Sequence, residues 1–302
     1  MTGRFAPSPT GRMHLGNIYS ALLSWLSVKS QRGQCLLRIE DIDTERSRQE
    51  YAEQIMDDLR WLGLEWDEGP YYQSRRSDIY MSNLKILNEK GLLYPCQCTR
   101  ADIMATQAPH ESDGRVVYKG TCRPLEPHPI AGIAELREKV RLVVPDREIT
   151  FTDGHYGQQT VNLATHCGDF ILRRADGAWA YQLAVVVDDA LMGVTEVVRG
   201  RDLLLSAAQQ IYLYEQLGYT APSFCHLPLL CNAAGQRLSK RDKSMDMGEL
   251  RANHSAAEII GWLACYAGII ERPEPLMPHD LIDEFSWSKV PTTDITIGLP
   301  IG

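Results

Sequence analysis

The chain has 302 residues, of which 44% are hydrophobic and 23% are charged, and its formal net charge is −8. This composition is typical of a folded globular protein, and it excludes a disordered chain, a collagen-like chain or a uniformly basic nucleic-acid coat. The length predicts about two domains of roughly 150 residues each. No apolar run approaches the ~20 residues that span a bilayer, and the first residues lack an apolar secretory segment. We therefore expect no membrane contact and a cytoplasmic location.

The first 94 residues alternate between short apolar runs and amphipathic segments. We expect a strand in GRFAPS, a helix that ends near Ser30, a strand in CLLRIED, and helices over 51–62 and 77–89. Ser47 and Glu50 have the spacing of a capping box and are expected to begin the second of these helices. Strand, helix, strand and helix in this order predict parallel βαβ units.

The composition changes near residue 95. From 95 to 176 prolines and polar residues are frequent, and VRLVV and REITFTD are the predicted strands, so we interpret this segment as an inserted domain. Asp176-Gly177 is a type I′ turn signal, which predicts that DFILRRADGAWAYQLAVVVDDALMGV is a hairpin returning into core strands. A helix is then expected to end at Gly218, and Ser255 with Glu258 predicts a capping box before an apolar helix.

A turn rich in glycine and proline joins the first strand to the first helix. The stretch APSPTGRMHLGN contains two prolines, two glycines and His14. A helix N-terminus presents unpaired N–H groups and a partial positive charge, which suits a phosphate. Gly11 and Gly16 would let the backbone approach a ligand closely. The alternative is a sharp turn in which His14 only caps its neighbour, and this stretch alone favours neither interpretation.

A basic loop late in the chain favours the phosphate site. RLSKR (Arg237–Arg241) follows a predicted strand and a turn that contains glycine. Together, PSPTGRMHLGN and RLSKR resemble the two ATP-binding signatures of the class I aminoacyl-tRNA synthetases, usually written HIGH and KMSKS. RFAPSPTG, RIEDID, YQLAVVVDD and VVRGRDLL resemble the glutamyl and glutaminyl branch, and the resemblance spans about residues 3–250.

The resemblance implies an α/β fold with a Rossmann-type parallel sheet, split by a zinc-containing insertion and followed by a small, mainly helical C-terminal appendage. The expected boundaries are 1–94 and 177–248 for the two halves of the catalytic domain, 95–176 for the acceptor-handling insertion, and 249–302 for the appendage. The family chemistry has two steps. An amino-acid carboxylate attacks the α-phosphate of ATP to give an adenylate and pyrophosphate, and the acyl group then passes to a nucleic-acid hydroxyl. Mg²⁺ is expected to accompany ATP.

By the same resemblance, His14 and Lys240 are the catalytic residues, one from each signature. The implied ATP-binding residues are Pro7, Thr10, Gly11, His14, Gly16, Asn17, Arg237, Leu238, Ser239, Lys240 and Arg241. The sequence departs from the family pattern at Asn17, where the HIGH signature ends in histidine. Asparagine can donate a hydrogen bond but carries no charge.

The activated amino acid is predicted to be L-glutamate. An acidic side chain needs a cation, and arginine can bind a carboxylate through two parallel hydrogen bonds. Arg4 and Arg199 end strand-like runs, where open α/β sheets bind ligands, although each could instead form a surface ion pair. The glutamyl family implies contacts to glutamate from Arg4, Phe5, Ala6, Pro7, Ser8, Glu40, Tyr181 and Arg199.

Cys96, Cys98 and Cys122 cluster within the predicted insertion. In a cytosolic protein such a cluster indicates a metal site rather than a disulfide, with three buried thiols as the alternative. Zn²⁺ prefers four tetrahedral ligands, and His110 or His128 would be the usual fourth. The glutamyl-queuosine branch has the pattern C-x-C…Y-x-x-x-C, which implies Tyr118 instead. We expect one structural Zn²⁺ that stabilises the insertion.

The sequence after RLSKR contains one apolar helix over 257–270 and a polar, proline-rich tail. This is too little for a separate anticodon-binding domain, and the short architecture resembles the glutamyl-queuosine branch. That branch implies a monomer that activates glutamate without tRNA and transfers it to queuosine in the anticodon stem-loop of tRNA(Asp). The alternatives are a truncated synthetase that charges a tRNA 3′ end, a smaller nucleotidyltransferase, and a catalytically inactive RNA-binding paralogue.

Overall fold

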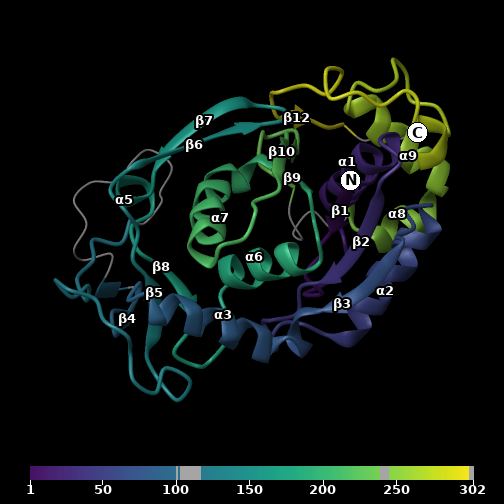
Figure 1. The fold of residues 1–302 in the computed structure, drawn as a ribbon. Coiled ribbons are helices and arrows are strands. Elements are labelled where there is room, and N and C mark those ends of the chain that lie inside the picture. The colour runs from purple at the N-terminus through teal and green to yellow at the C-terminus, as the bar shows by residue number, and fades with distance from the viewer. Residues whose placement is uncertain (100, 103–116, 239–244, 299–302) are drawn as a thin grey trace.

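The N-terminal part of the chain is a parallel α/β unit, as the pattern of strands and helices predicts (Figure 1). The computed structural model describes residues 1–99, 101–102, 117–238 and 245–298. Three strands lie in the order β1-β2-β3, all parallel, and two helices connect them. These elements are β1 (Thr2–Phe5), α1 (Leu15–Ser30), β2 (Gln34–Ile39), α2 (Gln49–Trp61) and β3 (Glu68–Tyr72).

A second parallel pair comes from a distant part of the sequence and lies beside β1. The N–H group of Thr195 donates to the carbonyl of Thr2 at 2.8 Å, and the N–H group of Thr2 donates to Thr195 Oγ1 at 2.9 Å. The pair and its helices are α6 (Tyr181–Leu191), β9 (Glu196–Gly200), α7 (Leu204–Leu217) and β10 (Ser223–Leu227). The α/β class with a parallel sheet is therefore confirmed.

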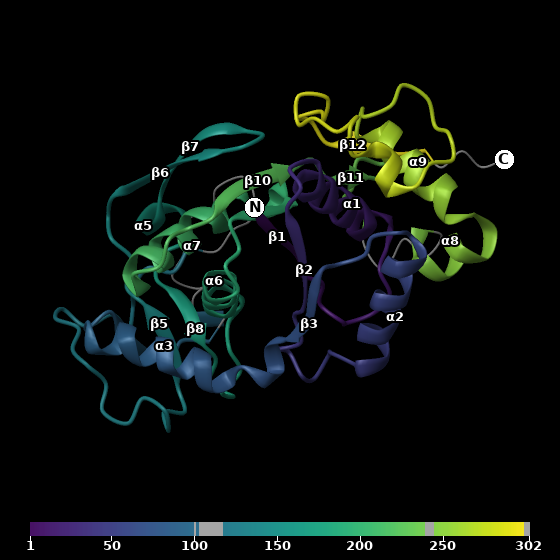
Figure 2. The ribbon, with the colours of Figure 1, turned by 45° about the vertical axis from the view of Figure 1, so that its right-hand side comes forward.

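Antiparallel strands lie between these two halves in the sequence. One sheet has the order β4-β5-β8, and a separate hairpin, β6-β7, joins the edge of β10 through β6. Both views place the β4-β5-β8 sheet at the end of the molecule away from the C-terminal helices (Figures 1 and 2). The elements are α3 (Ser77–Glu89), β4 (Leu93–Cys96), β5 (Lys139–Leu142), β6 (Glu148–Asp153), β7 (Gly157–Asn162), α5 (Leu163–His166) and β8 (Phe170–Arg173).

The segment predicted as an insertion shares its apolar core with the catalytic half. Val140 of β5 and Leu172 of β8 belong to one buried cluster with Leu84 of α3, Leu183 of α6 and Leu213 of α7. Joint burial of this kind stabilises all five elements together. The core therefore crosses the expected boundaries at residues 94–95 and 176–177. The division into separate domains remains a prediction.

The C-terminal region contains two α-helices and a 3-10 turn joined by irregular segments, and it packs against α1 (Figure 2). Its helix α9 begins with the predicted capping box, in which Ser255 and Glu258 each accept a hydrogen bond from the other's backbone N–H group. The elements of this region are α8 (Met247–Asn253), α9 (Ala256–Tyr266), a 3-10 turn (Pro278–Leu281) and β12 (Ile295–Thr296). The strand β12 pairs in parallel with β11 (Leu230–Cys231). Within the described residues, every helix is too short or too polar to cross a membrane.

The segment Tyr181–Leu191 is a helix, so the core strand predicted there is wrong. Its valines favour a strand, but the preference of such residues depends on tertiary context. The helix places two buried carboxylates, Asp188 and Asp189, within ion-pair distance of Arg38 on β2. The predicted type I′ turn is also wrong, because Gly177 has a φ of 88° but Asp176 is not in the left-handed region that this turn requires.

The capping box predicted from Ser47 and Glu50 is also wrong. Arg48 is the N-cap residue of α2, and its side chain makes no capping hydrogen bond. The N–H groups of Arg46 and Ser47 donate instead to the carbonyl of Asp43. A separate turn therefore occupies the expected first residues, and the helix begins at Gln49.

Candidate active site

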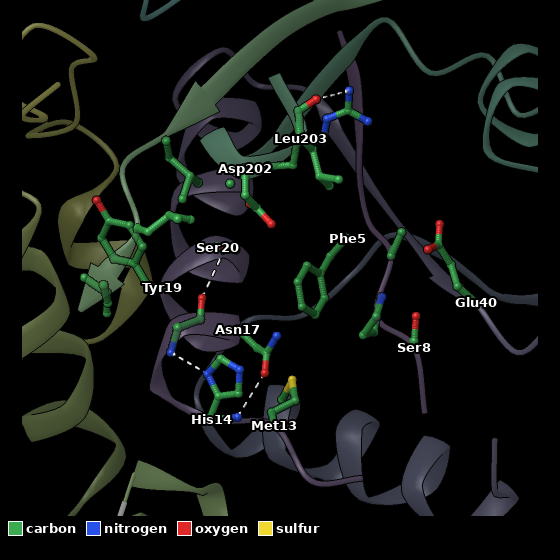
Figure 3. A pocket seen from close by; sticks show the side chains of 18 of the residues that line it. Phe5, Ser8, Met13, His14, Asn17, Tyr19, Ser20, Glu40, Asp202 and Leu203 are labelled. Carbon is green, nitrogen blue, oxygen red and sulfur yellow. Dashed lines mark hydrogen bonds between the residues drawn. The ribbon is translucent and has the colours of Figure 1, made fainter. Parts of the chain in front are cut away.

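A cavity of about 440 Å³ opens where four parallel strands end. Residues that end or follow β1, β2, β9 and β10 form its wall, the expected place for a ligand of an open α/β sheet. Figure 3 shows Phe5, Ser8, Glu40 and Asp202 around it. The structure brings together all the residues predicted to contact glutamate, since the lining includes Arg4, Phe5, Ala6, Pro7, Ser8, Glu40, Tyr181 and Arg199.

His14 lies at the mouth of this cavity as the N-cap of α1. Its Nδ1 accepts a hydrogen bond from the N–H group of Gly16 at 3.1 Å, and its own N–H group donates to Asn17 Oδ1 at 3.0 Å (Figure 3). With Nδ1 as the acceptor, a neutral ring carries its proton on Nε2, which is then a donor. Asn17 thus completes a capping box, a role that needs no charge.

The N-terminus of α1 can bind an anion. The first turn contains no acidic residue, so the partial positive charge of the helix end is not neutralised there. Of the residues predicted to bind ATP, this cavity is lined by Pro7, Thr10, Gly11, His14, Gly16, Asn17 and Arg237.

The remaining predicted ATP residues belong to the second signature. Leu238 is buried and forms no part of the cavity lining. Ser239, Lys240 and Arg241 lie outside the described residues. The described residues before and after this part of the chain lie close to the first signature. Leu238 is so near Gly16 that a Cβ atom added to the glycine would lie 3.9 Å from Leu238 Cβ. Asp246 forms a β-bridge with His14. The described residues at and beside the second signature therefore lie next to the first.

Buried charges surround the inner end of the cavity. Arg38 Nη1 donates to Asp189 Oδ1 at 2.6 Å, and its Nη2 donates to Glu40 Oε1 at 3.1 Å. Arg4 Nε donates to Asp189 Oδ1 at 3.3 Å. Burial opposes ionisation of Asp189, but Arg38 and Arg4 hold the pKa of its carboxyl below the ordinary value. Burial raises the pKa of Glu40 despite its contact with Arg38.

Arg199 is a buried cation of the cavity lining whose hydrogen-bond partners are neutral groups. Its guanidinium donates to Gln210 Oε1 at 2.8 Å, to His226 Nε2 at 3.1 Å and to the carbonyl of Leu203 at 3.3 Å. Arg4, by contrast, pairs with Asp189. In the described part of the chain Arg199 has no ion-pair partner, and burial lowers the pKa of its guanidinium. An anionic group in the cavity would supply the missing counter-charge.

Sequence reasoning missed the residues that hold the arginines in place. Arg38 and Asp189 are fully buried, as is His226 beside Arg199. A signal existed for the first two, because each is a charged residue within an apolar run, in CLLRIED and in LAVVVDD. Buried charges require partners, but the sequence does not show which residues will meet.

The cysteine cluster lies in the antiparallel part of the fold, where β4 ends. The thiols of Cys96, Cys98 and Cys122 lie within 4.8 Å of one another. Tyr118 joins them: its hydroxyl lies 3.5 Å from Cys96 Sγ and 3.9 Å from Cys98 Sγ, and it accepts a hydrogen bond from the N–H group of Cys122 at 2.8 Å. His128 is exposed and separate from the cluster, and His110 lies outside the described residues.

The donor set of this cluster suits a metal ion. Thiolates are the form in which cysteine binds a metal. Burial opposes ionisation of Cys122, but the N–H group of Gln97 and the Tyr118 hydroxyl lower the pKa of its thiol to about 7. Three thiols and one phenol oxygen match the four positions of a tetrahedral site in number. The three cysteines could therefore bind a metal.

Known sequences match this chain over nearly its whole length. The family model for the catalytic domain of the class I tRNA synthetases (E and Q) matches residues 1–260. A protein of Symbiobacterium thermophilum named glutamyl-Q tRNA(Asp) synthetase is 46% identical, covering 98% of this chain and 96% of its own. A protein of the same name from Nitratidesulfovibrio vulgaris is 47% identical, covering 96% and 93%.

Solved structures show the same fold. A glutamate tRNA ligase from Elizabethkingia meningosepticum, in complex with its amino acid, matches with a TM-score of 0.81 and 30% identity. The match covers 99% of this chain but 67% of the ligase. A glutamate-tRNA synthetase from Elizabethkingia anophelis gives the same TM-score and identity, with 99% and 68% covered.

Proposed function

The chain belongs to the class I tRNA synthetases of the glutamate and glutamine branch, a family of ligases, and from this premise we propose that it activates L-glutamate with ATP, without tRNA, and transfers the glutamyl group to queuosine at the wobble position of tRNA(Asp). The observation that carries the proposal is the pair of sites in one cavity. Arg199, a buried cation with no carboxylate partner among the described residues, and the N-terminus of α1, which can bind an anion, both line this cavity.

The cavity residues would orient glutamate for the first step. Arg199 would bind the side-chain carboxylate, and Glu40 would accept a hydrogen bond from the α-ammonium group. The α-carboxylate would then face the α-phosphate of ATP, whose charge the N–H groups of α1 and His14 Nε2 would stabilise. Attack by the carboxylate oxygen breaks the bond between the α- and β-phosphates and releases pyrophosphate. Lys240, with Ser239 and Arg241, would contact the phosphates from the second signature, and Mg²⁺ would accompany ATP.

The choice of acceptor rests on the relatives. Proteins named glutamyl-Q tRNA(Asp) synthetase match this chain over 93–96% of their own length. The glutamate tRNA ligase of similar fold has additional sequence, since 67% of it is matched. The cyclopentenediol of queuosine carries two neighbouring hydroxyl groups, as a terminal ribose does. Attack by one hydroxyl oxygen on the glutamyl carbonyl forms an ester and releases AMP, so the same active-site chemistry serves either acceptor.

We also propose that the cysteine cluster holds one structural Zn²⁺ through Cys96, Cys98, Cys122 and Tyr118. The support is the donor set and its closeness. The ion would connect the end of β4 to the residues around Tyr118, where buried apolar contacts are few. Cysteine thiols that are still protonated would release their protons when Zn²⁺ binds.

Amino-acid-dependent exchange of pyrophosphate into ATP tests the activation step. We expect exchange with glutamate in the absence of tRNA, and little exchange with glutamine or aspartate. Exchange with glutamine but not glutamate would contradict the assignment of the amino acid. If none of the amino acids supports exchange, the result would favour an RNA-binding paralogue without catalysis. If exchange strictly requires tRNA, the result would favour a truncated synthetase of the ordinary glutamyl type.

A further inference from the structure

Three buried side chains from three neighbouring strands meet behind the glutamate end of the cavity. Asp153 ends β6, His226 lies on β10, and Arg199 lies on β9 directly opposite His226 in the parallel register. Asp153 Oδ2 lies 2.5 Å from His226 Nδ1, and His226 Nε2 lies 3.1 Å from Arg199 Nε. Asp153 and His226 are at most 1% exposed, and Arg199 is 6% exposed.

Hydrogen-bond chemistry determines where the protons lie in this triad. The Nε of arginine can only donate, so His226 Nε2 must accept. The ring proton is then on Nδ1, where it is donated to the carboxylate of Asp153. His226 is therefore a neutral imidazole between a carboxylate and a guanidinium, and burial lowers its pKa in agreement with this state.

The opposite side of the guanidinium is held in a similar way. Arg199 Nη1 donates to Gln210 Oε1 at 2.8 Å, Gln210 Nε2 donates to Gln182 Oε1 at 2.8 Å, and Gln182 Nε2 donates to Gln209 Oε1 at 2.7 Å. Each amide orientation follows from the donor before it. Arg199 is thus fixed from two directions by neutral acceptors.

We propose that Asp153 and His226 are positioning residues that orient Arg199 for the ligand carboxylate without neutralising its charge, and that they thereby set the preference for glutamate over glutamine. This inference rests on the proposed function. A carboxylate in direct contact, such as Asp189 beside Arg38, would satisfy the guanidinium itself. The imidazole instead lies between Asp153 and Arg199, so Asp153 fixes the orientation of the guanidinium while its own negative charge stays one residue away. A ligand carboxylate therefore completes the site better than a ligand amide does.

Two variants with side chains of equal length separate the orientation of Arg199 from the neutralisation of its charge. In His226→Gln a neutral carbonyl oxygen can still accept from Arg199, whereas in His226→Glu a carboxylate replaces the imidazole. We expect His226→Gln to retain most of the preference in kcat/KM for glutamate over glutamine. His226→Glu should lower that preference by about tenfold or more, chiefly through a higher KM for glutamate. The exposed His279 provides matched controls in His279→Gln and His279→Glu, which should leave the preference unchanged.

The result that overturns the inference is an equal preference in folded His226→Gln and His226→Glu. If the wild-type chain activates no glutamate at all, the proposed function fails, and the inference fails with it. A second measurement covers variants that do not fold. The ¹⁵N NMR signals of the imidazole in the wild-type protein should show a protonated Nδ1 and an unprotonated Nε2. Protonation of both nitrogens near pH 7, or of Nε2 alone, would overturn the inference.

Discussion

Arg38 and Asp189 form an ion pair with an Nη1–Oδ1 distance of 2.6 Å, although 151 residues separate them in the sequence. Both side chains are essentially inaccessible to solvent. The pair joins β2 to α6, and the same carboxylate also accepts a hydrogen bond from Arg4 in the cavity wall. The network therefore links the stability of the two halves of the sheet to the geometry of the glutamate site.

Removal of one partner of this pair should strongly destabilise the protein. Arg38→Met leaves Asp189 buried with Arg4 as its one direct cationic partner among the described residues, and we expect the free energy of unfolding to fall by about 3–5 kcal/mol. Urea denaturation measures the change. Arg174→Ala is the matched control, because Arg174 pairs with Asp176 where both side chains are 50% exposed, and it should cost less than about 1 kcal/mol. Equal losses in the two variants would contradict this account of the buried pair.

His14 has two roles that different substitutions can separate. His14→Asn retains a good N-cap for α1 but removes the Nε2 donor. We therefore expect it to keep the free energy of unfolding within about 0.5 kcal/mol and to lower the rate of glutamate-dependent exchange by about 100-fold. His14→Ala should lose about 1 kcal/mol of stability as well. If His14→Asn exchanges pyrophosphate at the wild-type rate, His14 is a structural cap alone.

The affinity for glutamate should weaken as the pH falls. Burial raises the pKa of Glu40, and its charged form is the one that accepts a hydrogen bond from an ammonium group. Below that raised pKa, the Glu40 carboxyl must lose its proton before it can accept a hydrogen bond from bound glutamate. The Kd for glutamate should therefore increase by up to about tenfold for each pH unit. Calorimetric titration at a series of pH values, lowered from about pH 8 toward the ordinary glutamate pKa of about 4.3, measures this slope. Glu40→Gln should bind more weakly and lose the slope, and a wild-type Kd that does not change with pH would be inconsistent with the assigned role.

The cysteine cluster should hold about one zinc ion per chain. Elemental analysis after dialysis should show the ion in the wild type and its loss in Cys122→Ser. Cys167→Ser is the control, since Cys167 lies in the same segment but bonds to the carbonyls of Leu163 and Gly168. Tyr118→Phe should retain zinc but release it faster to a chelator. Wild-type protein without stoichiometric metal would refute the site.

The sequence predicts the site better than it predicts the elements that support it. The residues of RFAPS and Glu40 end parallel strands, and the topology of such a sheet brings strand ends together, so their meeting is predictable from local patterns. The burial of Arg38 against Asp189 depends on α6, whose valines indicate a strand, and only long-range packing decides that it is a helix. The neutral partners of Arg199 were likewise invisible, because His226 and Gln210 carry no motif.

The acceptor is the central claim, and two tRNA(Asp) substrates test it most directly. One carries queuosine but lacks the 3′-terminal adenosine, and the other has an intact 3′ end but guanine at the wobble position. The measurement is the transfer of labelled glutamate to each, with ATP and the wild-type chain. Our account predicts stable labelling of the first substrate and none of the second. Labelling of the second but not the first would contradict it and would identify a synthetase that charges the tRNA 3′ end.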